Sequence, residues 1–575
     1  MSPSILLRRQ FCHVLAIALA VGCQRAVVED TAADLVLRGG KIVTVDEERP
    51  EAEAIAIQGD TILAVGTNEE IDRHIGQATE VIELGGMLAI PGLIEGHAHF
   101  LGIGDARLQL DLMDAANWSD IVALVGAAAR DVAPGQLIRG RGWHQEKWDR
   151  VPGNAVHGLP THHALSDVSP DNPVVLRHAS GHASIANARA MEMAGITRET
   201  PDPAGGEIVR GADGEPIGMF RETAQGLLRA AMRGATPPDP RRQADLAVQE
   251  VLSKGITSFQ DAGSGFETVT LLKQMADEGA LGVRLYVMLR ADNDELAVRL
   301  DSTRTVGYGD QRLTVRAIKR SIDGALGPHG AWLLAPYEDL PASSGLNTSS
   351  VESIEETARL AIEHGYQLNV HAIGDRANRE VLDIFERTFL AHPDRTDLRW
   401  RIEHAQHLHP DDIPRFSRLG VIASMQGIHA TSDAPYVLER LGEQRAREGA
   451  YVWQRLMKDG ALVINGTDAP VEDVDPIASF HASVSRKLAD GSVFFPDQRM
   501  SREEALRSYT IDAARAAFEE ASKGSLEPGK LADITVLSGD IMTIPEGEIP
   551  AVRVVYTIVG GKVMWRTDAG ASAGG

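Results

Sequence analysis

Short runs of alternating apolar and polar residues occur near both ends of the chain. They cover residues 35–37, 41–45, 54–57, 62–65 and 80–83 near the start, and 533–537, 551–559 and 563–565 near the end. Alternation with period two, broken by Gly-Gly, Gly-Asp and Gly-Thr pairs, is typical of strands joined by turns. Neither set is large enough for a core of its own, so we predict that residues 34–86 and 525–567 pair into one composite β-sandwich.

Between these ends, continuous apolar runs alternate with amphipathic helical stretches. The apolar runs are residues 87–93, 255–260, 283–289, 315–322, 366–370, 398–402, 420–424 and 461–464. Apolar strands separated by helices of about 10 to 15 residues are typical of parallel βαβ units. Eight such runs predict an α/β fold, a (β/α)8 TIM barrel over residues 87–524.

The segment from about residue 101 to residue 250 is too long for one barrel loop. It contains helical and strand-like patterns of its own. We therefore predict that it forms an insertion that caps the mouth of the barrel.

Residues 1–23 are predicted to be an export signal. An Arg-Arg pair at residues 8–9 precedes an apolar run, residues 11–21, that is too short to span a bilayer. Residues 8–11 resemble a twin-arginine pattern, and residues 20–23 resemble a lipobox that ends at Cys23. We expect residues 24–33 to be a tether, and the protein to lie in the periplasm or on the bacterial cell envelope as a lipoprotein anchored at Cys23. An export signal without lipidation is the alternative.

Composition limits the possible partners and the residue types that can carry the chemistry. With 43% hydrophobic and 24% charged residues among 575, the chain is expected to be globular rather than disordered. A formal charge of -24 repels phosphate backbones, so we expect no nucleic-acid partner. The two cysteines, Cys12 and Cys23, both lie in the export segment, so the body of the protein has no thiol for a disulfide, a nucleophile or a cysteine zinc site. Metal chemistry must therefore use His, Asp, Glu or Lys.

Six potential metal ligands follow predicted barrel strands. His97 and His99 stand two residues apart at the end of the first strand, where both side chains lie on the same side. The others are Lys319, His371, His404 and Asp468. Since the carboxyl ends of barrel strands meet at one face, we expect these groups to converge there on a divalent metal, zinc, manganese or iron, with one or two ions per subunit.

Lys319 is unusual among these groups. A buried ammonium beside divalent cations would be repelled, so we expect Lys319 to be neutral, displaced or carboxylated to a carbamate that bridges two metals. The alternative is that Lys319 pairs with Asp323 or another acid in the barrel.

The motifs resemble those of the amidohydrolase superfamily, in its YtcJ-like (amidohydrolase 3) branch, which includes N-substituted formamide deformylases. The matching runs are PGLIEGHAHF, GITSFQDAG, Lys-x-x-x-Asp-Gly from Lys319, VHAIGDRAN, RIEHAQ, SMQGIHATSD, GTDAP and SLEPGKLADITVL. The resemblance implies His97 and His99 on one metal, His371 and His404 on a second, and carboxylated Lys319 as the bridge. It also implies that Asp468 is both a metal ligand and a proton carrier. The sequence departs from the family pattern at Gly427 and His144, near the expected substrate pocket. The resemblance therefore implies the metal site but not the substrate.

Several further residues are expected near the substrate. His429 and Asp433 follow the seventh strand, and we predict that they contact substrate or stabilise transition-state oxygen, with His429 as a catalytic group. The other candidates for substrate binding are Trp143, His144, Arg177, His178, His182 and His329. We also expect Asp375 and Arg376 to fix the loop after His371.

The leading hypothesis is an exported amidohydrolase that hydrolyses a non-peptide C–N bond, in an amide, formamide or cyclic amide, with a metal-activated hydroxide. The alternatives are a mononuclear deaminase, an ester, lactone or phosphotriester hydrolase on the same barrel, and a non-catalytic surface binding module. The expected partner is a small-molecule substrate, and by analogy with the family the protein is expected to form a homodimer.

Overall fold

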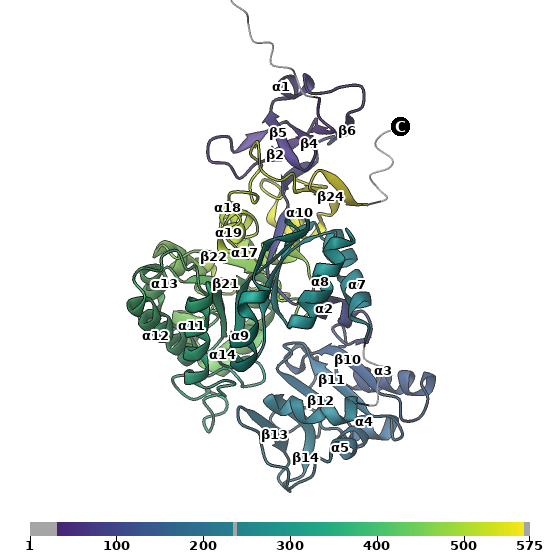
Figure 1. Cartoon of the computed structure of the whole chain (residues 1–575). Helices are drawn as coiled ribbons and strands as arrows, with labels where there is room; N and C mark the ends of the chain where they lie inside the picture. The colour runs from purple at the N-terminus through teal and green to yellow at the C-terminus, as the bar shows by residue number, and fades with distance from the viewer. Residues whose placement is uncertain (1–31, 234–237, 568–575) are drawn as a thin grey trace, which may run out of the picture.

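The predicted barrel forms the centre of the molecule (Figure 1). The computed structural model describes residues 32–233 and 238–567. Within them, eight parallel strands lie in the order β8-β15-β16-β18-β19-β20-β21-β22. Their bounds are Leu93–Ala98, Ile256–Ser264, Arg284–Leu289, Leu313–Ser321, Gln367–Ala372, Arg401–His404, Ile422–Gln426 and Val463–Gly466. The α/β class and the TIM barrel are therefore confirmed.

The first and last strands are joined by backbone hydrogen bonds at their carboxyl ends. Asp468 N donates to His97 O at 2.8 Å, and His99 N donates to Ala469 O at 2.8 Å. Two glycines permit this close approach. A Cβ on Gly96 would lie 2.3 Å from Asn465 O, and one on Gly466 would lie 2.4 Å from Glu95 Oε1.

The predicted first barrel strand, residues 87–93, is wrong. In the structure β7 (Leu88–Pro91) belongs to the sheet built from the two ends of the chain, and the barrel begins with β8 at Leu93. The chain changes sheets at Gly92, whose N donates to Asp533 O at 2.8 Å. Because β7 and β8 are both buried along their whole length, the apolar pattern carries no sign of this boundary.

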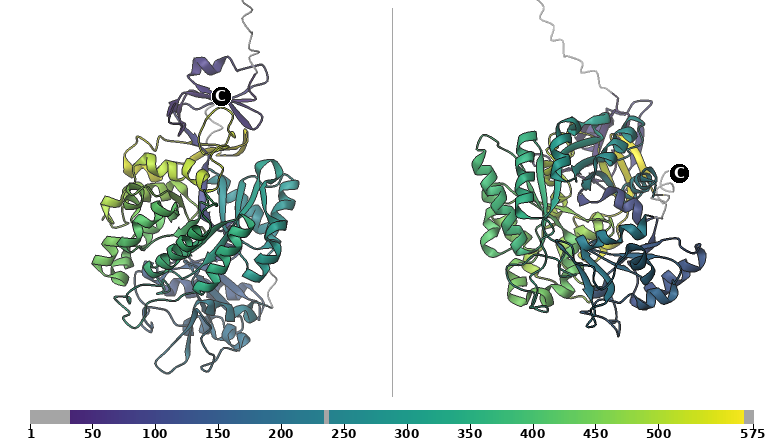
Figure 2. Two further views of the ribbon diagram at one scale, coloured as in Figure 1. Left: turned by 60° about the vertical axis from the view of Figure 1, so that its left-hand side comes forward. Right: turned by 60° about the horizontal axis from the view of Figure 1, so that its bottom comes forward.

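Helices cover the outside of the barrel, as the two rotated views show (Figure 2). Val351–His364 (α11) begins where Ser350 accepts a hydrogen bond from Ser353 N and ends at Gly365, whose φ is +69°. Such a serine cap and left-handed glycine are typical helix ends. The others include Phe100–Ala106 (α2), Pro240–Ser253 (α7), Phe266–Asp277 (α8), Asn293–Thr303 (α9), Asp375–Ala391 (α12), Ile413–Leu419 (α13), Gly427–Leu441 (α14), Trp453–Lys458 (α16), Pro476–Ser485 (α17), Arg502–Ser508 (α18) and Ile511–Ala516 (α19).

The two ends of the chain form two sheets that share one core. One sheet has the order β5-β4-β1-β6 and the other β25-β24-β23-β7-β2-β3. The bounds are Leu35–Arg38 (β1), Lys41–Val43 (β2), Glu51–Ala52 (β3), Ala54–Gln58 (β4), Thr61–Gly66 (β5), Glu80–Glu83 (β6), Ile534–Leu537 (β23), Val554–Val559 (β24) and Lys562–Arg566 (β25). Ala89 pairs with Val536 across β7 and β23, and apolar side chains of both sheets form one buried cluster. The composite sandwich is thus present.

A third sheet lies at the opposite end of the barrel from the sandwich (Figure 1). Its order is β13-β14-β12-β11-β10-β9. The strands are Leu110–Asp111 (β9), Ile138–Trp143 (β10), Val174–His178 (β11), Ala183–Ala186 (β12), Gly206–Arg210 (β13) and Pro216–Glu222 (β14), with helices Trp118–Asp131 (α3), His163–Val168 (α4) and Ala188–Ala194 (α5). The apolar residues of α2 and α7 join the barrel core. The cap is therefore formed by residues that lie between α2 and α7 in the sequence, a shorter range than the predicted 101–250.

The predicted export signal, and most of the predicted tether, lie within residues 1–31, outside the described part of the chain. Among the residues that the structure describes, no helix is both long enough and apolar enough to traverse a membrane. Export and lipidation at Cys23 therefore stay predictions from the sequence.

A buried ion pair joins the barrel to the sandwich. Arg284, at the start of β16, donates from Nε to Asp533 Oδ2 at 2.7 Å and from Nη2 to Asp533 Oδ1 at 2.9 Å. Asp533 also accepts from Gly560 N at 2.8 Å. Burial alone would raise the pKa of Asp533, but the Arg284 guanidinium holds it below the usual value. The two-point geometry fixes the orientation of the side chains as well as their charges.

Arg284→Met is expected to lower the free energy of unfolding by about 3–5 kcal/mol, because it leaves a buried carboxylate without its partner. Since folding lowers the pKa of Asp533, the contribution is present above the unfolded pKa of about 3.9 and is lost as the pH falls through the lower folded value. Chemical denaturation measures both effects. Arg418→Met, in an exposed pair with Glu386, is the control and should cost less than about 1 kcal/mol. An Arg284→Met protein as stable as wild type would contradict this role.

Candidate metal centre

The six predicted ligands come together at the carboxyl ends of the barrel strands. His97 lies near the end of β8 with its imidazole buried, and its Nε2 lies 3.4 Å from Lys319 Nζ on β18. The ring centroid of His404, at the end of β20, is 4.6 Å from that of His97 and 4.5 Å from that of His371 on β19. The barrel thus gathers into one place groups that are far apart in the sequence.

Asp468 connects the two ends of this cluster. Its Oδ1 lies 3.3 Å from His99 Nε2 and 3.6 Å from His97 Nε2. His97, His99 and Asp468 can each place one ligand atom within 4.8 Å of the others, and so can His404, His429 and Asp468. The structure therefore offers two overlapping groups of His and Asp ligands that share Asp468.

Several buried atoms at the centre have no hydrogen-bond partner among the described residues. They include His371 Nε2 and Asp468 Oδ1, the latter 3.3 Å from His99 Nε2 but outside hydrogen-bond geometry. Buried polar atoms are rarely left unpaired, so these atoms need an explanation. Imidazole nitrogen and carboxylate oxygen are ligands that suit zinc, manganese or iron. The donor set and its unpaired atoms fit a divalent metal.

Neighbouring side chains fix the orientation of two of the histidines. Glu403 Oε2 accepts a short hydrogen bond from His97 Nδ1, and Gln426 Oε1 lies 2.8 Å from His404 Nδ1. Both bonds leave Nε2 directed at the cluster. A carboxylate behind a metal-binding histidine also raises the basicity of the imidazole. Neither Glu403 nor Gln426 was predicted from the sequence, although each stands in a motif beside a predicted residue.

The backbone is strained at two of the ligands. His404 has φ +77° and Asp468 has φ +57°, in the left-handed region that side chains other than glycine rarely adopt. Such strain costs about 1–3 kcal/mol per residue and persists where the surrounding structure enforces it. Both residues belong to the metal centre, His404 at the end of β20 and Asp468 on the loop after β22.

The electrostatics favour the forms that bind metal. Burial lowers the pKa of His97, His99, His371 and His404, so these imidazoles are neutral at neutral pH. Burial alone would raise the pKa of Asp468, but the imidazoles of His99, His404 and His97 hold it well below the usual value. Burial lowers the pKa of Lys319 to about 8. No ion pair joins Lys319 to Asp323 or to any other acid in the described chain.

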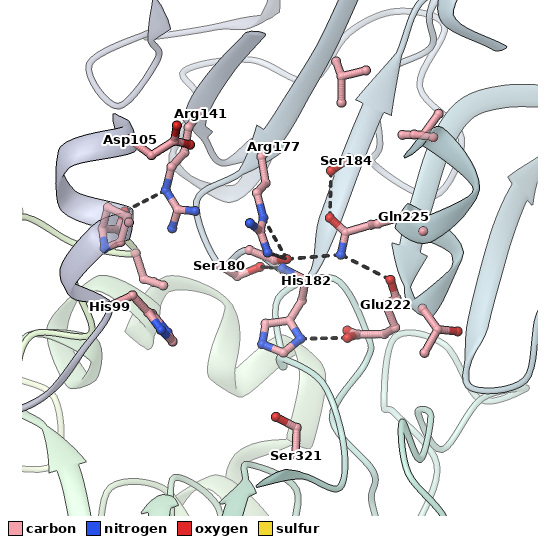
Figure 3. Close-up of a pocket in the computed structure, with 18 of the residues that line it drawn as sticks. His99, Asp105, Arg141, Arg177, Ser180, His182, Ser184, Glu222, Gln225 and Ser321 are labelled. Carbon is pink, nitrogen blue, oxygen red and sulfur yellow. Dashed lines mark hydrogen bonds and ion pairs between the residues drawn. The ribbon is translucent and has the colours of Figure 1, made fainter. Parts of the chain in front are cut away.

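A cavity of about 660 Å³ separates this centre from the cap (Figure 3). The barrel contributes His99, Lys319, His371, His404 and Asp468 to its wall, and the cap contributes Arg141, Arg177, His182, Glu222 and Gln225. A smaller pocket of about 40 Å³ also touches His371, His404 and Asp468. It extends toward His144, His429 and Asp433. The metal centre is therefore open to a small molecule from the cap side.

Most of the predicted substrate residues line these cavities. Arg177 and His182 line the larger one, and His144, His182, His429 and Asp433 line the smaller one. The Asp433 carboxylate accepts hydrogen bonds from the hydroxyls of Tyr436 and Tyr451. Asp375 accepts from Leu334 N at 2.8 Å, so it supports the loop after His371.

The structure places three of the predicted candidates, Trp143, His178 and His329, outside both cavities. Trp143 is buried in the core of the cap, where its Nε1 donates to Leu176 O at 3.0 Å. His329 is held by Asp339 through a 2.9 Å contact and lines neither cavity. His178 is buried, with Ser180 and Gln145 as hydrogen-bond partners. These residues stabilise the structure around the site, a role that their sequence motifs do not distinguish from binding.

The departure at Gly427 has a structural reason. Its N–H donates to Asn465 Oδ1 at 2.8 Å, and a Cβ there would lie 2.2 Å from Ser483 Oγ. Proline, which the family pattern has at this place, would lose the donor. Gly427 is therefore suited to its neighbours in this chain and does not disturb the metal ligands.

Comparison with known proteins identifies the family. Residues 80–565 match the model of the amidohydrolase family, so the chain belongs to that family. The protein LONG AFTER FAR-RED 3 of Arabidopsis thaliana is 33% identical over 546 residues, which cover 93% of this chain and 92% of that protein. An N-substituted formamide deformylase of Arthrobacter pascens is 28% identical over 539 residues, covering 92% and 97%. The predicted family is thus confirmed.

Solved structures support the same class. The crystal structure of an uncharacterized metal-dependent hydrolase from Pyrococcus horikoshii OT3 aligns with a TM-score of 0.70 and 26% identity, covering 89% of this chain and 99% of that one. Together with the candidate His and Asp ligands, this similarity assigns the chain to the metal-dependent hydrolases of the amidohydrolase superfamily.

Glu403→Gln is expected to lower metal affinity about 10- to 100-fold, because His97 loses the anion that orients it and raises its basicity. The measurement is metal per chain by elemental analysis after dialysis against a weak chelator. Glu352→Gln, at an exposed position at the start of α11, is the matched control and should retain metal as wild type does. Equal retention by Glu403→Gln would show that this carboxylate does not support the centre.

Proposed function

We propose that the protein is an exported hydrolase that cleaves a non-peptide C–N bond in an amide, formamide or cyclic amide. The observation that carries this proposal is the group of His and Asp ligands at the carboxyl face of the barrel, open to a cavity under the cap. The similarity to an N-substituted formamide deformylase over nearly the whole chain supports the choice of bond. The proposal of export, to the periplasm or the surface of a bacterial cell envelope, rests on the pattern of residues 1–23.

The residues present can hold one or two zinc ions. His97, His99 and Asp468 form one ligand group, and His371 and His404 lie beside it. We assign Lys319 as a carbamate bridge, since its Nζ lies 3.4 Å from His97 Nε2 and has no carboxylate partner among the described residues. When bound, such ions lower the pKa of water and polarise a substrate carbonyl.

Asp468 is placed to move the proton. Its Oδ1 is buried among the histidines, 3.3 Å from His99 Nε2, and the residue lines the cavity. The carboxylate is ionised because the surrounding imidazoles lower its pKa. We assign it to accept a proton from the attacking water and to deliver that proton to the leaving nitrogen.

His429 is placed to stabilise developing negative charge. Gln406 Nε2 lies 3.0 Å from His429 Nδ1. An amide that donates to Nδ1 fixes the tautomer that carries the ring proton on Nε2. His429 Nε2 has no partner among the described residues, and the ring lines the smaller pocket. An N–H directed at the carbonyl oxygen of a substrate would stabilise the tetrahedral oxyanion.

Metal-loaded protein is expected to hydrolyse members of a panel of N-substituted formamides, simple amides and cyclic amides. Asp468→Asn should lower kcat about 100-fold or more with most of the metal retained, as expected for loss of a general base. Steady-state kinetics and elemental analysis measure the two effects. Asp473→Asn, on the exposed side of the same loop, is the control. Near-normal turnover by Asp468→Asn would remove the proton-transfer assignment.

Two further sets of compounds test which bond the enzyme cleaves. One set consists of matched esters and lactones, and the other of aminated heterocycles. Turnover confined to esters and lactones would replace C–N cleavage with ester hydrolysis. Release of ammonia from heterocycles alone would favour the mononuclear deaminase.

Lys319→Ala is expected to lose metal and activity, because the bridge between the two ligand groups is gone. Partial recovery with a short carboxylic acid is expected, since that anion can occupy the place of the carbamate. Intact mass before and after acid treatment should show the loss of one carbon dioxide from wild type only. Full metal content in Lys319→Ala would exclude a bridging role.

A further inference from the structure

Two arginines of the cap stand side by side over the metal centre. Arg141 on β10 and Arg177 on β11 are directly paired in the register of these parallel strands. Both line the large cavity, and Figure 3 shows their side chains extending into the same space as His99 and His182. Like charges at facing positions of neighbouring strands destabilise a sheet. A bound anion would remove this repulsion.

Neither arginine has a carboxylate partner among the described residues, although acids line the same cavity. Asp105 forms an ion pair with Arg139 at 3.1 Å, and Glu222 is held by His182 at 2.7 Å. Asp105 and Glu222 are therefore already engaged, and Asp468, on the opposite side of the cavity lining, belongs to the metal centre. The charges of Arg141 and Arg177 stay available in a protein whose net charge is -24.

Backbone carbonyls fix the direction of both guanidinium groups. Arg141 donates from Nε to Pro470 O at 3.0 Å and from Nη2 to Ala179 O at 2.9 Å. Arg177 donates from Nε and Nη2 to Gly181 O, at 3.3 and 3.1 Å. In each case Nη1 has no partner within the described chain. Each of these two cavity-lining arginines thus has one Nη1 left for a ligand.

A hydrogen-bond network fixes the Gly181 carbonyl, which accepts the hydrogen bonds of Arg177. Gly181 O also accepts from Gln225 Nε2 at 3.1 Å, and Ser184 Oγ donates to Gln225 Oε1 at 2.7 Å. The left-handed φ of +75° at Gly181 allows the turn that carries this carbonyl. Side chains oriented by such a network lose little freedom when a ligand binds.

The arginine pair is also tied to the reacting centre. Pro470, which accepts from Arg141 Nε, lies two residues after Asp468 on the loop that closes the barrel. On the opposite wall, Arg290 Nη2 contacts Ser321 Oγ at 3.5 Å, two residues after Lys319. Arg290 likewise has no carboxylate partner in the described chain. An anion held by Arg141 and Arg177 would therefore lie in the same cavity as a bond placed at the metal ligands.

We propose that the substrate carries a carboxylate, which Arg141 and Arg177 bind with one Nη1 each while the scissile C–N bond reaches the metal ligands. Two free donors match the two oxygens of a carboxylate. This inference rests on the proposed function, and it narrows the substrate class to N-formyl and N-acyl compounds bearing a carboxylate, such as N-substituted amino acids.

Metal-loaded full-length protein tests the inference with N-formyl-L-alanine and N-formyl-L-phenylalanine, each compared with its neutral carboxamide. We expect kcat/KM for the acid to exceed that for the carboxamide about 10- to 100-fold, the usual effect of hydrogen bonds to a charged group. Arg177→Gln should reduce this ratio severalfold, mainly through KM, because only Arg141 then remains to bind the carboxylate. Arg189→Gln removes an arginine from the outer surface of the cap, where Arg189 pairs with Glu192, and should leave the ratio as in wild type.

Calorimetric binding of the same acid and carboxamide separates this inference from the proposed function. Tighter binding of the acid by wild type, reduced in Arg177→Gln, supports the carboxylate site even if neither compound is hydrolysed. Hydrolysis of both compounds with equal kcat/KM and equal affinity would overturn the inference while leaving the C–N hydrolase in place. No binding and no turnover of the acids would also overturn it. N-formyl-aminomethylphosphonate is a further probe. If the protein prefers it to the carboxylates, the two arginines bind a phosphate-like group instead.

Discussion

The close approach of β8 and β22 is the constraint on which the centre depends. His97 and His99 belong to the first barrel strand and Asp468 to the loop after the last, and backbone hydrogen bonds between these segments bring the three side chains together. Gly96 and Gly466 allow the approach because a Cβ on either would overlap the opposite segment. Glu95 reinforces the junction, since its carboxylate accepts from Thr467 N at 2.7 Å and from Thr467 Oγ1 at 2.9 Å. Without this junction the metal ligands would remain two separate groups.

The barrel and the cap contribute different chemical groups to the site. The barrel supplies neutral imidazoles and the Asp468 carboxylate, all held by buried partners such as Glu403 and Gln426. The cap supplies arginines that carry charge into the same cavity. Chemistry that is common to the fold can therefore be combined with a preference for one kind of substrate, because the two sets of residues lie in different parts of the chain.

Periodicity and spacing predicted the barrel, the sandwich and the convergence of the six ligands, because each depends on local pattern and on the rule that barrel strands end at one face. The boundary at Gly92 was missed, since β7 and β8 are both buried and differ only in the sheet they join. Trp143 and His329 were predicted to contact substrate, but Trp143 bonds to the Leu176 carbonyl and His329 to the Asp339 carboxylate. Neither of these contacts can be recognised from the sequence around the residue. The facing position of Arg141 and Arg177 depends on strand register in the cap, which one sequence does not specify.

The central claim is that the cluster of His97, His99, His371, His404 and Asp468 binds a catalytic divalent metal. The most direct test is metal per chain by elemental analysis of purified protein, together with hydrolysis before and after a strong chelator. We predict about one or two transition-metal ions per chain, loss of hydrolysis with the metal, and recovery when zinc is returned. Protein that hydrolyses its substrate with far less than one metal ion per chain would contradict the account.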